Sequence, residues 1–495
     1  MRKLILLLVF ALSFSNTFSQ ELLSEQSISL VKVSSEDKIE SYPIVNNENG
    51  QMALFLIDRY TLNAQLFDKN FNLVQNIQAE APDRAFTYLL GCSIKDDRYT
   101  LIFTNGSQDM FYCKTINFKD ETSSGYQLPV ELNKEVFLHT FSSNNHFFFL
   151  TLRVKSSVLK IYSFDDVDNF QAKEIDLSGF AFSNSIKSTL YDVICQRGVY
   201  APTDSRFYEI DNTLPNPLDI TSKTNKIYCF NNKLFLTLDN DFNKTTLITL
   251  DLKDYSSKVN TYNQGIVTCG ADEKIKSNSY IYKNFLFLIA GCRNGITFLK
   301  YNLSTDSLIK EFRVNKDQEI YFKNSPFIID GKRKIFAQDS EKILDNPELF
   351  FRKLCTGDIG ISLYQTPLAT EVTIGGFRQN DKSGQGMTQG AAAGLFGGLA
   401  LGLVYGIAYA NNPAMFEYTS YAHTRSTYFK CLFDTITFEH LDGEVQKNAF
   451  DKISDFLETL KTSATVETII KMNDYYVYGY YDRKAKKYYL RKFAD

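Results

Sequence analysis

Histidines and closely spaced carboxylates are the residues of this 495-residue chain with the most potential for catalysis or metal binding. The four histidines are His139, His146, His423 and His440. None of them forms an H-E-x-x-H motif or another zinc-binding spacing, so we expect structural or exposed roles for them. No G-x-S-x-G elbow for a nucleophilic serine occurs. The hypothesis of a catalytic pair of carboxylates is left open by the sequence, because two carboxylates need only be close in space. The sequence itself therefore identifies no catalytic, cofactor-binding or metal-binding residue.

Three acidic runs have some of the oxygen ligands of a calcium-binding loop. In the run 239–243, Asp and Asn alternate, but Lys244 stands where the loop needs glycine and Leu250 where it needs a bidentate glutamate. The runs 68–72 and 165–168 are equally unspecific. Asp and Asn more often form tight turns, so we expect turns between strands at these places.

A stripe of glycines at every fourth position is the strongest association signal in the chain. Residues four apart lie on one face of a helix, and a face without side chains lets a second helix approach closely. We expect a helix over 384–410 that inserts into a membrane, packs on a partner helix, or joins a second copy of the chain. A flexible glycine-rich loop is the other interpretation. The stripe consists of Gly386, Gly390, Gly394, Gly398, Gly402 and Gly406.

The flanks of this stripe argue against a simple membrane anchor. The segments 361–364, 372–374 and 427–433 look like strands. If they pair with one another, the stripe is an insertion between strands of one sheet, and both of its ends emerge on the same side. A single transmembrane pass would then be excluded, which leaves a re-entrant segment or a helix that lies along protein.

The N-terminus and the composition indicate an exported protein. Residues 1–20 contain a basic start, an apolar run and a small-residue cleavage site, the pattern of a signal peptide. We therefore expect the periplasm or cell envelope, with membrane association through 384–410. The charge balance of 54 basic and 57 acidic residues argues against a nucleic-acid partner. The eight cysteines are scattered through apolar runs, so we expect mostly free, buried thiols.

A strand-rich unit recurs every 42–52 residues between about 50 and 310, and this predicts a mainly β fold. Such units suggest a β-propeller-like ring of six to eight antiparallel blades, and the rival is an irregular sandwich or an array of hairpins. Aromatic anchors of the first strands are Phe55, Phe103, Phe149, Phe235 and Phe287, and anchors of the second strands are Phe67, Phe118, Phe164, Ile210, Leu252 and Leu303.

The last part of the chain predicts an amphipathic helix over 444–461 and a closing β-hairpin that pairs 475–480 with 488–490. The basic residues of this hairpin could bind an anionic lipid surface, although a solvated turn is the simpler interpretation. We divide the chain into a signal peptide (1–20), propeller-like repeats (21–350), further strands with the inserted helix (351–440), and the helix and hairpin (441–495).

Our leading hypothesis from the sequence is a non-enzymatic, exported binding or scaffold protein of the cell envelope, without a cofactor. The glycine stripe would mediate membrane insertion or self-association, and the propeller would bind an unknown protein or glycan. One alternative is a propeller hydrolase or lyase that acts on an envelope or extracellular polymer. It predicts Asp, Glu, His, Arg or Tyr side chains that converge in a central pocket. A second alternative is a subunit of a membrane-embedded assembly.

Overall fold

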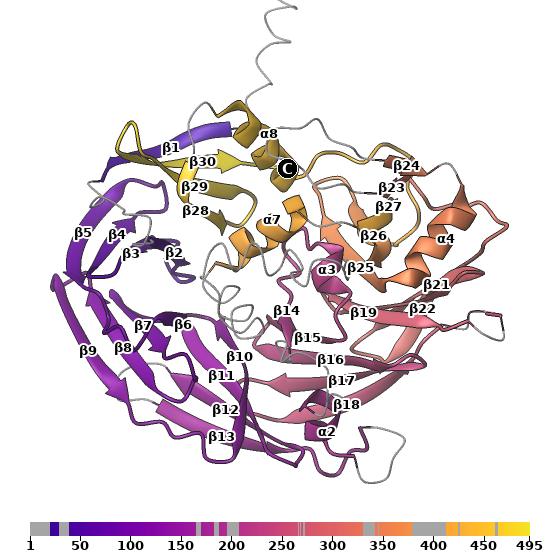
Figure 1. Cartoon of the computed structure of the whole chain (residues 1–495), viewed down its shortest axis with the longest axis horizontal. Helices are drawn as coiled ribbons and strands as arrows, with labels where there is room; N and C mark the ends of the chain where they lie inside the picture. Colours follow the sequence, from indigo (N-terminus) through magenta and orange to yellow (C-terminus); the bar gives the residue numbers. More distant parts are fainter. Residues whose placement is uncertain are drawn as a thin grey trace, which may run out of the picture.

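The described residues form seven sheets, almost entirely antiparallel, and Figure 1 shows them arranged around a common centre. The first strand of each of the first five sheets lies nearest the centre, and the last lies on the outside. The predicted mainly β, propeller-like fold is therefore confirmed. The computed structural model describes residues 20–28, 39–164, 170–182, 188–195, 207–265, 267, 269–270, 273–329, 342–344, 346–378, 412–423, 426–460 and 464–495.

The sheets follow one another along the chain. The first three consist of β2 (Glu40–Val45), β3 (Met52–Ile57), β4 (Thr61–Phe67) and β5 (Leu73–Glu80); β6 (Tyr88–Lys95), β7 (Arg98–Thr104), β8 (Phe111–Asn117) and β9 (Thr122–Leu128); and β10 (Glu135–Ser143), β11 (His146–Arg153), β12 (Val158–Phe164) and β13 (Phe170–Asp176). The fourth and fifth consist of β14 (Tyr208–Glu209), β15 (Asn225–Phe230), β16 (Lys233–Asp241), β17 (Lys244–Asp251) and β18 (Ser257–Asn263); and β19 (Lys276–Tyr282), β20 (Phe285–Cys292), β21 (Gly295–Asn302) and β22 (Ser307–Asn315).

The last two sheets do not follow the simple chain order. The sixth has the order β24 (Lys342–Leu344), β23 (Phe327–Ile329), β27 (Ser426–Phe433), β26 (Thr370–Phe377) and β25 (Asp358–Gln365). The seventh has the order β1 (Gln20–Ser27), β30 (Lys487–Phe493), β29 (Tyr476–Asp482) and β28 (Ala464–Lys471). Because β1 pairs with β30, the seventh sheet combines strands from opposite ends of the chain.

The second strand of a sheet is buried on both faces, and this explains the aromatic runs in the sequence. All six residues of β3 are buried, and so are six of the eight residues of β11. In the third sheet the Phe149 ring stacks on Tyr162 of the next strand, with the ring centres 4.2 Å apart. Side chains that face both neighbouring sheets in this way form the core between blades.

Tight turns that contain two asparagines join several of these strands. Asn144 and Asn145 connect β10 to β11, and Asn231 and Asn232 connect β15 to β16; all four have positive φ. This is the conformation of the two-residue hairpin turn that matches strand twist, and asparagine tolerates it better than most residues. Asn145 Nδ2 also donates to Asn46 Oδ1 at 2.9 Å, so turns of different sheets are tied together.

Five helices are described: α2 (Leu190–Cys195), α3 (Leu218–Thr221), α4 (Pro347–Thr356), α7 (Pro413–His423) and α8 (Ala449–Thr459). The predicted C-terminal helix and hairpin are present, but α8 begins at Ala449 and not at 444. The reason is a capping box, in which the Asn448 side chain accepts from the backbone N–H of Asp451 and the Asp451 carboxylate accepts from that of Asn448. Figure 1 shows α7 and α3 in the middle of the ring, where α7 contacts β28 and α3 contacts β25.

The prediction of a membrane-spanning helix is wrong for the part of the chain that the structure describes. No helix there is long and apolar enough to cross a membrane. The topology gives the physical reason, because β26 and β27 are neighbours in one sheet and Phe377 pairs with Ser426. The connection between these two residues therefore starts and ends at the same end of the two strands. The glycine stripe itself, in 384–410, lies outside the described residues, as does the signal sequence before Gln20.

Candidate functional site

A cavity of about 240 Å³ lies among the innermost strands of three sheets, next to α7. Its walls come from β6, β10, β15, the segment that follows β14, and the start of α7. Carboxylate and aromatic side chains lie side by side in this wall. The lining residues used below are Phe141, Glu209, Asp211, Cys229, Phe230 and Pro413.

Glu209 and Asp211 both line the cavity because they lie two residues apart on one extended stretch. Alternate residues of a strand point to the same face. The Ile210 N–H donates to the Ile227 carbonyl oxygen at 2.9 Å, so the extended pairing continues beyond Glu209. Asp211 Oδ1 accepts hydrogen bonds from the Thr213 backbone N–H (2.9 Å) and hydroxyl (2.6 Å). These donors fix the orientation of the Asp211 carboxylate.

The Glu209 carboxyl contacts a buried histidine. His139 Nε2 lies 2.9 Å from Glu209 Oε2, and the His139 side chain is 1% exposed whereas that of Glu209 is 17% exposed. His139 Nδ1 has no hydrogen-bond partner among the described residues. A buried N–H without an acceptor is costly, so we assign the proton to Nε2, which then donates to Glu209. Burial raises the pKa of Glu209, Asp211 raises it further, and His139 acts in the opposite direction.

Two further carboxyl groups lie behind the cavity wall, in α3 and α7. Glu417 is completely buried, and neither of its carboxyl oxygens has a hydrogen-bond partner among the described residues. Asp219 accepts a hydrogen bond from the Ser420 hydroxyl at 2.6 Å. Burial raises the pKa of Glu417 well above its ordinary value, and the charges of the nearby carboxylates add to this effect, that of Asp219 most strongly. These effects favour the neutral, protonated form of Glu417.

The remaining lining residues used here are apolar or neutral, and they determine the shape of the cavity. Phe141 stacks on Phe148, and Phe230 stacks on Phe235, with ring centres 5.1 and 4.8 Å apart. Each aromatic side chain of the wall is therefore held by a residue of the next strand. Burial raises the pKa of the Cys229 thiol to about 12, so this cysteine is not a thiolate nucleophile at neutral pH.

Most residues that drew attention in the sequence have structural roles. His139 is the histidine at the cavity wall, and His440 Nε2 lies 3.0 Å from Asn324 Oδ1. The run 68–72 forms a turn in which Asp68 Oδ1 accepts from the backbone N–H of Asn70 and of Asn72, both at 2.9 Å. These contacts occupy the oxygen that a calcium ion would need. The run 165–168 lies outside the described residues.

The acidic run 239–243 and the basic hairpin are also part of the fold. Asp239 is fully buried against Lys226, with a separation of 2.6 Å between Oδ2 and Nζ. In the hairpin, Lys487 pairs with Glu25 of β1, and Lys492 Nζ lies 3.6 Å from Glu21 of the same strand. The hairpin charges thus partly neutralise the acidic strand β1.

Cysteine usage agrees with the expectation of mostly free thiols, because six of the cysteines are outside a disulfide and one pair, Cys269–Cys292, is bonded.

Sequence analysis did not single out Glu209, Asp211 or Glu417. They share no motif, and the ring brings Glu417 to the others from more than 200 positions away in the sequence. The acidic i, i+2 pair at 209 and 211 is the one available signal, but several surface turns of this chain have the same pattern.

Comparison with known proteins gives a distant similarity of structure. No family model and no curated protein matches the chain. Among solved structures, a chimera of ACO and RPE65 matches with 6% identity and a TM-score of 0.29, over 57% of this chain and 63% of that one. Cobalt-substituted apocarotenoid oxygenase (ACO) from Synechocystis matches with 6% identity and a TM-score of 0.27, over 56% and 61%. The matches therefore span less than two thirds of those chains.

These findings correct the functional hypothesis. The hypothesis of a non-enzymatic scaffold with a membrane helix is corrected, because no helix of the described residues can cross a membrane and two carboxyl groups line one cavity. The similarity is too distant to transfer a reaction or a substrate to this chain. The site itself meets the condition set for an enzyme, since Glu209 and Asp211 both line a central cavity and His139 contacts Glu209.

Proposed function

We propose that this protein is an exported propeller hydrolase that cleaves a neutral polysaccharide of the envelope or the extracellular space by acid–base catalysis. The observation that carries the proposal is the pair of carboxyl groups in one cavity, with one of them biased toward its protonated form. Hydrolysis of a glycosidic bond needs such a pair, an acid for the leaving group and a base for the water.

The environments of the two carboxyl groups suggest their roles. Glu209 is the general acid, because burial raises its pKa and so favours the protonated form. Asp211 is the general base, since the Thr213 donors engage Oδ1 and orient the carboxylate. Two residues along an extended chain have Cα atoms about 6.6 Å apart, and a similar separation of the carboxyl groups leaves room for a water between them.

The charge and shape of the cavity favour a neutral sugar. The Asp211 carboxylate, the proposed general base, lies in the cavity wall, so an anionic polymer such as a polyuronate meets electrostatic repulsion there. A polysaccharide lyase eliminates next to the carboxylate of a uronate. The repulsion of polyuronates therefore favours hydrolysis over elimination. Phe141 and Phe230 offer flat apolar faces beside the carboxyl groups, an arrangement that suits the apolar faces and polar edges of a sugar ring.

The test is release of reducing ends from a panel of neutral polysaccharides, with polyuronates as the negative set. We expect activity on at least one neutral polymer, and a loss of kcat of at least about 100-fold in Glu209→Gln and in Asp211→Asn. The surface variant Glu444→Gln is the matched control and should keep full activity. The acid role also predicts that activity of the wild type falls as pH rises through the Glu209 pKa. Wild-type activity that both substitutions leave intact would refute the assignment, and so would the absence of activity on every neutral polymer.

A further inference from the structure

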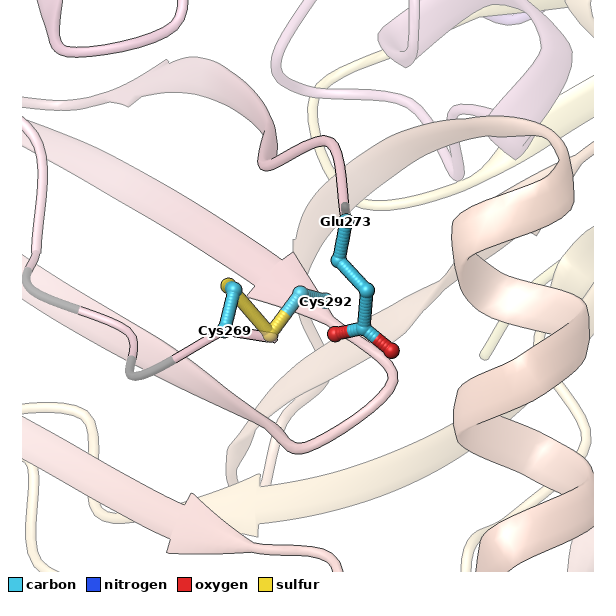
Figure 2. Close-up of side chains that lie close together, drawn as sticks. All are labelled: Cys269, Glu273 and Cys292. Atoms are coloured by element: carbon cyan, nitrogen blue, oxygen red, sulfur yellow. A yellow bond between two sulfur atoms is a disulfide. The ribbon is translucent and has the colours of Figure 1, made fainter. Parts of the chain in front are cut away.

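Three side chains that can bind a soft metal ion meet at one edge of the fifth sheet. Cys269 and Glu273 lie in the segment between β18 and β19, and Cys292 is the last residue of β20. The two Sγ atoms and a Glu273 carboxylate oxygen all lie within 4.8 Å of one another. Figure 2 shows the Glu273 carboxylate directly beside the two cysteines. This site is separate from the central cavity and does not depend on the proposed function.

In the structure the two cysteines form a disulfide that ties this segment to β20. Their Cα atoms are 6.0 Å apart, and 23 positions separate them in the sequence. A tetrahedral zinc ion with Zn–S bonds of about 2.3 Å holds two sulfurs about 3.8 Å apart. Rotation of the cysteine side chains about their Cα–Cβ bonds can change the separation of the sulfurs without moving the backbone far. The same backbone is therefore compatible with a disulfide and with a pair of metal-bound thiolates.

The turn before β19 holds the carboxylate ligand in place. The Glu273 backbone N–H donates to the Gly270 carbonyl oxygen at 3.0 Å, and the Gly270 N–H donates to Glu273 Oε2 at 3.3 Å. These two bonds close a short loop that starts next to Cys269. The third ligand of the set is thus oriented by the backbone, as ligands of metal sites commonly are.

The surrounding charges suit a divalent cation bound by three anionic ligands. Two thiolates and one carboxylate leave one net negative charge on such a complex. Arg293 follows Cys292 directly, and Lys276 lies three residues after Glu273. Glu273, Arg293 and Lys276 all influence the charge state of the Cys355 thiol, which shows that these charges share one neighbourhood. Lys276 Nζ also lies 3.4 Å from Asp358 Oδ1, so Arg293 is the cation that can balance the complex.

We propose that Cys269, Glu273 and Cys292 form a redox-controlled site for a zinc-type metal ion, closed as the disulfide and open after reduction. An external dithiol supplies two electrons and two protons, its own sulfurs become a disulfide, and the Cys269–Cys292 bond becomes two thiols. Binding of Zn²⁺ then releases the two thiol protons. Thiolate ligands select zinc over calcium or magnesium, and three protein ligands leave a fourth position for water.

The experiment is a Zn²⁺ titration of the full chain in its oxidised and its dithiol-reduced form, with the reductant removed under argon. We expect one more equivalent of Zn²⁺ bound by the reduced form. Cobalt substitution of the reduced form should give the near-ultraviolet absorption of a cobalt–thiolate bond. Glu273→Gln should weaken Zn²⁺ binding by at least about tenfold, since loss of a direct ligand costs no less than loss of an outer partner.

Two kinds of variant separate this site from other metal binding. The double variant Cys269→Ser/Cys292→Ser should lose the additional equivalent. The matched controls, Cys195→Ser at a cysteine of α2 outside the disulfide and Glu348→Gln at the exposed start of α4, should keep it. Equal Zn²⁺ binding by the oxidised and reduced forms would overturn the proposal. So would an additional equivalent that survives in the double variant, or unchanged affinity in Glu273→Gln.

Discussion

Replacement of Glu417 by glutamine should stabilise the protein, and the gain should grow with pH. The carboxyl group is completely buried, its oxygens have no partner among the described residues, and three carboxylates lie nearby. The folded-state pKa is therefore raised, whereas in the unfolded chain the group ionises near pH 4.3. Between these two values the folded protein holds one proton more than the unfolded chain, so its stability falls as pH rises.

The expected magnitude follows from this linkage. One proton corresponds to about 1.4 kcal/mol of unfolding free energy for each pH unit. Glutamine has the shape of the protonated acid but cannot ionise, so Glu417→Gln loses this dependence. The difference in unfolding free energy between variant and wild type should grow by about 2–3 kcal/mol from pH 5 to pH 7.

The assay is equilibrium unfolding by urea at several pH values, for wild type, Glu417→Gln and the control Glu444→Gln. Glu444 is exposed, and its substitution should leave the pH dependence of the wild type unchanged. If the stability difference between Glu417→Gln and wild type is the same at pH 5 and pH 7, then Glu417 is not a buried protonated acid. The account of the charges behind the cavity would then be wrong.

Three other predictions concern contacts that hold the ring together. Lys226→Met should lower the unfolding free energy by about 3–5 kcal/mol in urea unfolding, because it leaves the Asp239 charge buried and unpaired; Lys226→Met with Asp239→Leu should recover most of the loss. Gly375→Ala should cost about 1–3 kcal/mol in the same assay, because its Cβ would lie 2.4 Å from the Thr427 carbonyl oxygen, and an unchanged midpoint would contradict that packing. Asn448→Ala should lower the unfolding free energy by about 1 kcal/mol through loss of the α8 cap, whereas Asn448→Asp should retain most of it.

Much of the architecture was predictable because the second strand of each blade is buried on both faces. Phe55, Phe103, Phe149 and Phe287 lie in such second strands, and Phe235 lies in β16, the buried third strand of the fourth sheet. The outer strands were not recognised, because β5, β9 and β13 are mostly exposed and polar, and they have little periodicity. The two turns that use a pair of asparagines were not recognised either.

The candidate site was much less predictable than the fold. Glu209 lies in a strand of only two residues, and Glu417 lies in a helix whose hydrophobic pattern is weak. Neither sequence context distinguishes a site residue from a solvated carboxylate. Burial, and the side chains that other parts of the ring place beside them, make these two residues part of a site. No local sequence pattern shows either. The same holds for Cys269 and Cys292, since their closeness depends on the register of β19 with β20.

The pairing of β1 with β30 has a consequence for synthesis on the ribosome. A hydrogen-bonded pair across these strands, Lys487 and Glu25, is 462 positions apart in the chain. β1 is therefore made long before β30, the strand with which it pairs. Until β30 is made, the edge of β1 is open to wrong partners, and contacts of such long range form slowly. Completion of the ring should thus depend on chaperones that shield nascent chains, and a nonsense mutation ahead of Lys487 should release an aggregating product.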